Sequence, residues 1–380
     1  MKKNQLVTLG KHIDILSGCA FPSSGFNRNN GVPLIRIRDI LSGKTETYYE
    51  GSYDLKYLIK KGDLLVGMDG DFNREYWKGT DALLNQRVCK ITPNPETLDK
   101  NFLYHFLQKE LDKIHATTDV VTVKHLSVKK IQDIKIRLPS LKEQKRIAAI
   151  LDKADAIRQK REQAIKLADD FLRAKFLEMF GTPANNIHRF PKGTIRDLVD
   201  SVNYGTSAKA SIDSGEYPIL RMGNITYQGR WDFTDLKYLD LSVKEKDKYL
   251  VKEGDLLFNR TNSKELVGKT AVYEEDRPMA FAGYLIRVRP NSIGNNYYIS
   301  GYLNSIHGKI TLMNMCKSIV GMANINAQEL QNIEILIPPK HLQDEYEIIY
   351  KKIKKGLSIY DKSAMQLQLL ASNLSNEYFM

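Results

Sequence analysis

The sequence predicts an α+β protein with two similar globular domains, separated by two long helices that form an antiparallel coiled coil. The first observation behind this prediction is an internal repeat. Residues 31–40 (GVPLIRIRDI) match residues 216–225 (EYPILRMGNI), residues 60–70 (KKGDLLVGMDG) match 252–262 (KEGDLLFNRTN), and residues 131–144 (IQDIKIRLPSLKEQ) match 330–343 (LQNIEILIPPKHLQ). The offsets of 185, 192 and 199 residues are too long for a solenoid and indicate a duplicated domain with insertions in its second copy. The second observation is an amphipathic helical pattern after each copy.

Each copy contains short apolar and β-branched runs separated by turn signals, which is typical of strands. The runs cover residues 33–37, 63–66, 87–91 and 134–138, and in the second copy 218–222, 255–258, 284–288 and 333–337. Residues 101–113 and 296–309 have the pattern of a helix. We therefore expect two compact α+β domains, at residues 1–139 and 182–338, with structural turns at Gly62-Asp63 and Gly254-Asp255.

Residues 140–181 and 339–380 are expected to form the long helices. Ser140 and Glu143 predict a capped start, and Gly181 predicts the end. Positions 147, 150, 154, 157, 161, 164, 168, 171 and 175 form one seam of the first helix, and positions 346, 349, 353, 356, 360, 363, 367, 370 and 374 form one of the second. Each helix would be roughly 60 Å long. Pairing within the chain is the simplest way to cover both seams, and pairing with another subunit or a second copy stays open.

Composition favours a polyanionic partner. The 57 Lys and Arg residues exceed the 45 Asp and Glu residues, for a net charge of +12, which suits nucleic acid or an acidic membrane surface. No apolar run approaches the length needed to span a bilayer, and Asn4 and Gln5 interrupt the signal-like start, so we expect a cytoplasmic protein. The three isolated cysteines have no metal spacing and are expected to be reduced.

Polar loops at matching positions of the two copies carry side chains suited to DNA. Arg, Asn, Gln and Lys pair with base edges, and Lys also suits phosphates. Taken singly, each is more simply a solvated loop residue, whereas as a set in two basic domains they favour DNA contact. Trp77 could stack on a base, and a place at the edge of the core fits it equally well. The candidate contact residues are Arg36, Arg38, Asn73, Arg74, Trp77, Gln86, Arg87, Arg221, Asn224, Asn259, Arg260, Asn262, Lys264 and Lys269.

Motifs of catalysis and metal binding are incomplete. Asn94-Pro95-Glu96 lacks the second proline and the aromatic residue of an adenine-methyltransferase motif. Residues 263–270 (SKELVGKT) resemble a phosphate loop but have Ser263 in place of the first glycine. The calcium-loop spacing that begins at Asp69 fails at Arg74 and Thr80. We therefore expect no catalytic residue, no metal site and no cofactor on this chain.

Over nearly its whole length the chain resembles the specificity subunits of type I restriction-modification systems. Residues 138–181 (LPSLKEQKRIAAILDKADAIRQKREQAIKLADDFLRAKFLEMFG) are similar to the central conserved region of that family, and residues 337–343 (IPPKHLQ) with the final helix resemble its distal conserved region. Segments 68–73 (MDGDFN), 84–91 (LNQRVCKI), 254–262 (GDLLFNRTN) and 267–273 (VGKTAVY) are similar to segments of its target recognition domains.

The resemblance implies a subunit without chemistry of its own. Each recognition domain binds one half of a bipartite, asymmetric DNA target, while the helices set the spacer and dock two modification subunits. Those subunits carry S-adenosylmethionine and methylate adenine; restriction subunits join them, and ATP and Mg are expected on the partners. The second helix lacks the run at residues 143–147 and carries Gly356, so docking there could differ. The alternatives are a self-sufficient DNA methyltransferase or nuclease, and a coiled-coil scaffold that binds only proteins.

Overall fold

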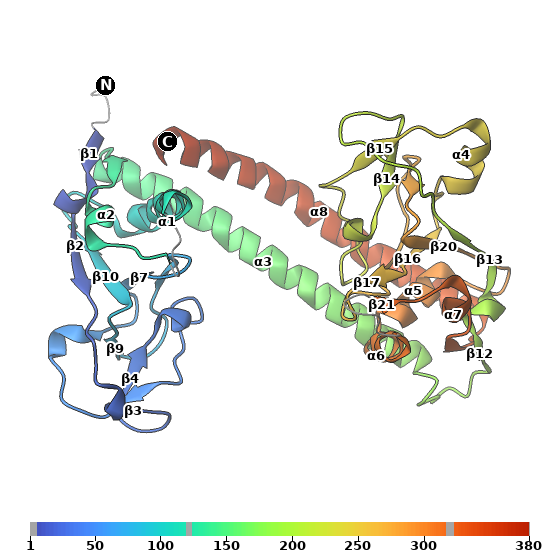
Figure 1. The fold of residues 1–380 in the computed structure, drawn as a ribbon, viewed down its shortest axis with the longest axis horizontal. Coiled ribbons are helices and arrows are strands. Elements are labelled where there is room, and N and C mark those ends of the chain that lie inside the picture. Colours follow the sequence, from blue (N-terminus) through green and yellow to red (C-terminus); the bar gives the residue numbers. More distant parts are fainter. Residues whose placement is uncertain (1–5, 119–123, 317–322, 380) are drawn as a thin grey trace. The chain divides into compact units, whose positions relative to one another are not determined.

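The computed structural model describes residues 6–118, 124–316 and 323–379, apart from the side chains at 359–365, 368, 375, 377 and 378 (Figure 1). The chain divides into two compact units, residues 1–161 with 361–380, and residues 162–360. Each unit contains one copy of the repeat and a part of both long helices. Within the described residues, no helix is both long and apolar enough to cross a bilayer.

The first unit is built on a four-stranded antiparallel sheet in the order β2-β10-β7-β8. Its strands are β2 (Ile13–Ser17), β7 (Leu64–Gly67), β8 (Arg74–Tyr76) and β10 (Val88–Pro93). A five-stranded sheet follows, with β3 (Phe26–Asn27), β4 (Val32–Ile35), β5 (Tyr48–Tyr49), β6 (Leu58–Ile59) and β9 (Ala82–Leu84). The remaining elements are β1 (Leu6–Thr8), which pairs with β11 (Lys135–Arg137), and the helices α1 (Lys100–Thr117) and α2 (Val128–Gln132).

The second unit repeats this plan with the order β13-β20-β16-β18. The strands are β13 (Val199–Tyr204), β16 (Leu256–Asn259), β18 (Thr270–Val272) and β20 (Leu285–Pro290). The other strands are β14 (Tyr217–Leu220), β15 (Lys237–Leu239) and β19 (Ala280–Phe281) in one sheet, β12 (Lys192–Thr194) paired with β22 (Glu334–Leu336), and β17 (Thr261–Asn262) paired with β21 (Ala323–Asn324). The helices are α4 (Val243–Tyr249), α5 (Asn296–Asn304), α6 (Ile306–Met315) and α7 (Ala327–Gln331).

The duplication predicted from the sequence is confirmed by this shared strand order, and each of the eight predicted strands is present. The turn aspartates also repeat: Asp63 accepts the amide of Lys60 at 2.8 Å, and Asp255 accepts the amide of Lys252 at 2.9 Å. One prediction is corrected. The helix expected at residues 296–309 breaks at Ser305, whose hydroxyl accepts the amide of Gly308 at 3.0 Å and so begins α6.

The two long helices are present, as α3 (Leu141–Phe180) and α8 (Lys340–Phe379). At the start of α3, the Ser140 hydroxyl accepts the Glu143 amide at 3.3 Å, and at its end Gly181 has a positive φ of 68°. Buried glutamines tie both helix starts to their domains. Gln144 donates to the carbonyls of Thr97 and Pro139, and Gln343 donates to those of Ile293 and Pro338.

The helix ends meet in antiparallel fashion within each unit. In the first unit Phe379, at the end of α8, packs edge-on against Phe102 of α1 and shares a buried core with Ile147, near the start of α3. In the second, Phe176 near the end of α3 contacts Tyr346 near the start of α8, with ring centroids 5.3 Å apart.

The seam predicted for α3 departs from the structure at its far end, where Phe171 is 49% exposed. Phe176 and Phe180 are buried in its place, packed against Tyr298 of α5. A straight helix drifts by about 20° per heptad relative to a seven-residue pattern, so a seam that begins at Ile147 turns away from the core after several heptads. In α8, seam positions 360 and 363 lie outside the described side chains.

Candidate nucleic-acid interface

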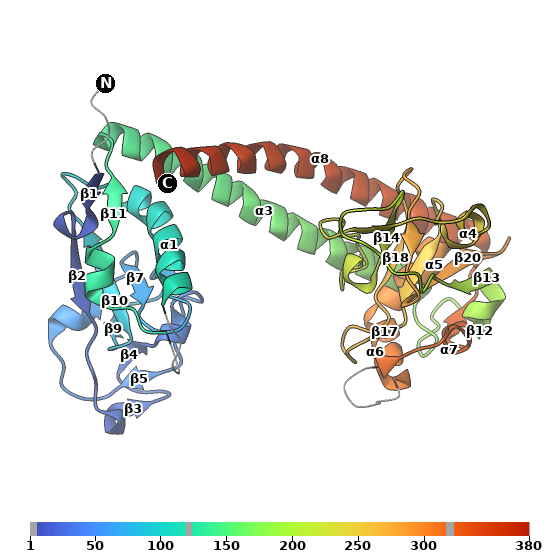
Figure 2. The same cartoon turned by 45° about the horizontal axis from the view of Figure 1, so that its top comes forward.

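One backbone frame recurs in both domains at the ends of β7 and β16, which are inner strands of the two four-stranded sheets. Figure 2 labels β7 and β10 of the first sheet and β18 and β20 of the second. Past β7, the amide of Gly67 donates to the Asn73 carbonyl at 2.8 Å and the amide of Met68 donates to the Arg87 carbonyl at 2.9 Å. Residue Asp69 then forms a bridge with His125. These main-chain bonds hold the loops that carry Asn73, Arg87 and His125 beside the end of β7, which we call the edge of the first domain.

The second domain makes the same bonds past β16. The amide of Asn259 donates to the Lys269 carbonyl at 2.9 Å, and the amide of Arg260 donates to the Tyr284 carbonyl at 3.0 Å. Thr261 then pairs with Asn324 in the short β17–β21 ladder. The two edges therefore share a main-chain pattern and differ in side chains.

A short 3₁₀ turn completes each edge. In the first domain this turn is Ile37–Asp39, where Asp39 accepts the Arg36 amide at 2.8 Å. The Ile37 side chain lies so close to β7 that a Cβ on Gly67 would be 3.0 Å from Ile37 Cγ1. A side chain at position 67 would therefore require Ile37 to move by a few tenths of an ångström.

The second turn, Met222–Asn224, repeats the arrangement: Asn224 accepts the Arg221 amide at 2.8 Å. Here the turn is fastened by Lys269, whose ammonium donates to the Met222 carbonyl at 2.8 Å. Burial lowers the pKa of Lys269.

Four predicted contact residues of the first domain are exposed at this edge: Arg36, Arg38, Gln86 and Arg87. The Arg87 guanidinium forms an ion pair with Asp69, which also lies 2.6 Å from His125 Nδ1. Arg38 contacts Asp39 more loosely, at 3.7 Å. Guanidinium groups held at the surface by one carboxylate keep further donors free for a base edge or a phosphate.

Two other predicted residues of this domain are structural. Trp77 is 2% exposed, because it fills the core below the five-stranded sheet and its Nε1 donates to the Thr80 carbonyl at 2.7 Å. Its buried ring has no face for stacking on a base. The Arg74 guanidinium lies over the Tyr104 ring of α1 at 3.4 Å, so it braces β8 against the helix. Asn73 is half-buried.

In the second domain three predicted residues are buried. Asn224 donates to the carbonyls of Asp232 and Asp235, Asn259 is fully buried, and Lys269 is 7% exposed. Because their polar groups lie inside the domain, we no longer assign them contacts with DNA. Lys269, a candidate DNA contact, instead donates to the Met222 carbonyl of its own domain.

The other four predicted residues of this domain reach the surface to different degrees. Lys264 is exposed, and Asn262 is half-buried with its side chain accepting the Ser263 amide at 2.9 Å. Arg221 forms an ion pair with Asp235 at 2.7 Å. Half-buried Arg260 lies over the Tyr204 ring at 4.8 Å, and among the described residues its Nε has no hydrogen-bond partner.

The sequence reasoning missed three residues at these edges. Tyr284 is 55% exposed at the position equivalent to Arg87, and Tyr204 is 41% exposed beneath Arg260. Aromatic rings at a basic edge are suited to stacking and to van der Waals contact with bases. His125 joins Asp69 from a distant segment. The alignment of residues 87–91 with 284–288 already placed Tyr284 over Arg87, so the repeat itself contained that signal.

Within the described residues, no group of three or more His, Cys, Asp or Glu side chains is arranged to hold a metal ion. Cys19, Cys89 and Cys316 are free, and burial raises the pKa of Cys89 to about 12, which keeps that thiol protonated.

A family model described as the type I restriction modification DNA specificity domain matches residues 1–167 and 190–371. The chain is 30% identical over 401 residues to the type I restriction enzyme EcoBI specificity subunit of Escherichia coli, across 97% of this chain and 82% of that protein. It is 23% identical over 377 residues to the EcoKI specificity subunit of Escherichia coli strain K12, across 92% and 80%.

The fold is similar to the crystal structure of a type I restriction-modification S subunit from M. genitalium, with a TM-score of 0.64, 15% identity, and coverage of 98% of this chain and 95% of that one. This similarity shows that the two chains share the same fold. Since the family model matches twice, once over each copy of the repeat, the chain belongs to the family of type I restriction-modification DNA specificity subunits.

Proposed function

We propose that this specificity subunit reads a bipartite, asymmetric DNA target, one half with each domain, and performs no chemistry itself. The observation that supports this most directly is the shared main-chain frame with unlike side chains. The pairs Gly67/Asn259, Asn73/Lys269 and Arg87/Tyr284 occupy equivalent hydrogen-bonded positions. A duplicated frame offers the same approach to duplex DNA twice, and its exposed pair Arg87/Tyr284 presents a different side chain to the bases in each domain.

The spacer between half-sites is set, in this proposal, by the long helices. Residues 1–139 and 182–338 act as target recognition domains, and residues 140–181 and 339–380 act as the spacer rods. Helix α3 has 40 residues, hence a length of roughly 60 Å. One turn of duplex is about 34 Å, so half-site centres of the order of one to two turns apart fit a rod of this length.

Partner subunits supply the chemistry. Both long helices carry exposed apolar side chains suited to docking, with Leu167 and Phe171 on α3 (61% and 49% exposed) and Leu369 on α8 (64% exposed). We propose that two modification subunits with S-adenosylmethionine dock on these helices, and that restriction subunits with ATP and Mg join them. Such a complex works where the genome lies, in the cytoplasm.

The proposal is tested by mapping methylated adenines in DNA modified by the chain together with modification subunits. We expect a two-part asymmetric motif with a spacer of fixed length. Removing one heptad from α3 should shorten the preferred spacer, and an unchanged spacer would refute the role of the rods.

Binding should also weaken steeply with salt, because each phosphate contact displaces condensed counterions, and a flat response would argue against backbone contacts. Methylation by the pure chain alone would support the enzyme alternative. Failure to retain DNA even with the modification subunits would support the protein scaffold.

A further inference from the structure

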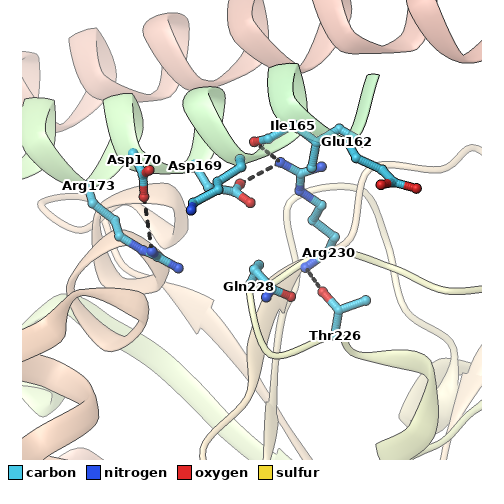
Figure 3. Close-up of a pocket in the computed structure, with 9 residues that line it drawn as sticks. Glu162, Ile165, Asp169, Asp170, Arg173, Thr226, Gln228 and Arg230 are labelled. Carbon is cyan, nitrogen blue, oxygen red and sulfur yellow. Dashed lines mark hydrogen bonds and ion pairs between the residues drawn. The ribbon is translucent and has the colours of Figure 1, made fainter. Parts of the chain in front are cut away.

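A cavity of 500 Å³ separates the C-terminal half of α3 from the loop that follows the Met222–Asn224 turn (Figure 3). Arg230 crosses this space from the loop. Its guanidinium lies 2.5 Å from the Asp169 carboxylate and 3.4 Å from the Ile165 carbonyl, both on α3. The two side chains are 27% and 14% exposed, so the pair is shielded from water much better than an ordinary surface ion pair.

The loop that carries Arg230 is held firmly by the domain. The Thr226 amide donates to the Arg230 carbonyl at 2.9 Å, and the Arg230 amide donates to the Thr226 hydroxyl at 3.0 Å. Gly229 has a φ of 80°, and a Cβ there would lie 2.4 Å from Asn304 Nδ2 and 2.6 Å from the Thr270 carbonyl. The loop is therefore pressed against α5 and β18, with no space to shift toward them.

The same loop is tied to the candidate DNA-contacting edge. The Asp232 amide donates to the Asn224 carbonyl at 2.8 Å, and Asn224 Nδ2 donates back to the Asp232 carbonyl at 2.9 Å. Asn224 also holds the Arg221 amide, and Trp231 Nε1 donates to the Val272 carbonyl at 2.8 Å. A short series of direct bonds thus connects Asp169 on the helix with the Met222–Asn224 turn.

A second attachment between α3 and this domain is aromatic. Phe176 stacks on Tyr298 of α5 with ring centroids 5.6 Å apart. Asp169 and Phe176 are seven residues apart, which is about 10 Å along a helix. The aromatic contacts of Phe176 and Phe180 hold the end of α3, and the ion pair adds a point of attachment about two turns earlier on the helix, which limits how far the domain can tilt about that end.

We propose that the Arg230–Asp169 pair is a positioning device that sets how strictly the subunit measures spacer length. It holds the reading edge of the second domain at one angle to α3. Without it, the edge can tilt to meet a half-site displaced by a base pair. This inference rests on the proposed function, because it presumes that α3 acts as the rod between two half-sites.

The test uses the full chain assembled with modification subunits and a series of duplexes that carry both half-sites with the natural spacer or a spacer one or two base pairs longer or shorter. The variants are Arg230→Ala, Asp169→Asn and the charge exchange Arg230→Asp with Asp169→Arg. The matched control is Arg173→Ala, which removes another cation of the same cavity, paired with Asp170 at 3.6 Å. Thermal melting of each variant reports whether the domain still folds, and Arg230→Gln replaces Arg230→Ala if that variant does not.

We expect Arg230→Ala and Asp169→Asn to lower the discrimination against wrong spacers by about tenfold. This is the change in a binding constant that the loss of one charge-assisted hydrogen bond produces. Base preference within each half-site should stay unchanged, Arg173→Ala should behave as the natural chain, and the charge exchange should restore strict spacing. The proposal is overturned if folded Arg230 variants keep the natural spacer profile, or if Arg173→Ala broadens it equally. Failure of the natural chain to prefer any spacer would instead refute the proposed function.

Discussion

Asp255 and its repeat counterpart Asp63 provide a matched test of how burial controls the stability of each domain. Asp255 is 4% exposed and holds two hydrogen bonds from the Arg289 guanidinium, at 2.7 and 3.0 Å. Arg287 lies beside it, also 4% exposed, with its pKa lowered by burial and then by Arg289. Replacing Asp255 with Ala would leave this buried arginine without its counter-charge.

Asp63 has the same turn geometry in a wetter place. Its partner is Lys90 at 3.0 Å, and the two side chains are 23% and 27% exposed. A lysine at such a site can extend its ammonium into water when the carboxylate is lost. We therefore expect a loss of unfolding free energy of about 3–5 kcal/mol for Asp255→Ala, where a partly buried ion pair is broken. For Asp63→Ala we expect about 1–2 kcal/mol, the value of one half-buried pair whose lysine can reach water and one capping hydrogen bond.

The chain contains two tryptophans, one in each unit, so the unfolding of each unit can be followed separately by tryptophan fluorescence. In a Trp77→Phe background the fluorescence of Trp231 reports the second unit, and in a Trp231→Phe background Trp77 reports the first. Urea titrations of each aspartate variant, compared with its own background, give the change in midpoint at constant slope. Equal losses at the two sites, or a loss at Asp255 below about 2 kcal/mol, would refute the reasoning from burial.

Three further predictions follow from the same contacts. Arg87→Ala should relax base preference in one half-site by about 1–3 kcal/mol, and Tyr284→Ala should change base preference only in the other half-site. Methylation of target variants by the complex with modification subunits measures both effects. A change in both half-sites from one substitution would contradict separate reading. Burial, with smaller contributions from Arg173 and Lys269, lowers the pKa of Lys309 to about 8 from its ordinary 10.5. Between about pH 8 and 10.5 the unfolded chain therefore binds more protons than the folded chain, so the free energy of unfolding should rise with pH over this range. Lys309→Met should remove that rise, measured as the difference between urea midpoints of variant and natural chain, and an identical pH profile would contradict it. Gly356→Ala should stabilise α8 by about 1 kcal/mol, because an added Cβ there meets nothing within 4 Å, and a lower melting temperature would contradict the helix-propensity argument.

The fold was largely predictable because its determinants are local or repeated. The repeat aligned Asp63 with Asp255 and Gln144 with Gln343, and each pair makes equivalent hydrogen bonds. The ends of α3 followed from Ser140 and Gly181, whose roles depend only on neighbouring residues. The break at residue 305 was missed, since a serine inside a helical pattern is compatible with both a continuous helix and a new cap.

Residue roles at the interface were predicted less well, because burial is decided by segments distant in the sequence. Trp77 is covered by the five-stranded sheet, and Lys269 is drawn inward by the carbonyl of Met222, 47 residues away. Side-chain type gives no information about such contacts: asparagine and lysine suit DNA in an open loop and suit main-chain carbonyls in a closed one. Asn224 illustrates the second case, with three hydrogen bonds to the backbone.

The two copies also show how recognition can change while the fold is kept. Positions that are alike in both copies, such as Asp63/Asp255, use their side chains to bind the backbone, so substitution there removes a structural bond. Positions that differ, such as Arg87/Tyr284, are held through their main-chain carbonyls, which accept the amides of Met68 and Arg260 and which every residue has. In the proposed function, structural and reading tasks therefore fall on different residues, the aspartates just before β7 and β16 and the candidate contacts beyond the ends of these strands. It follows that the side chains at the proposed reading positions can diverge with little cost to folding. If the long helices set the spacer as proposed, the spacer changes only when the length or the attachments of those helices change.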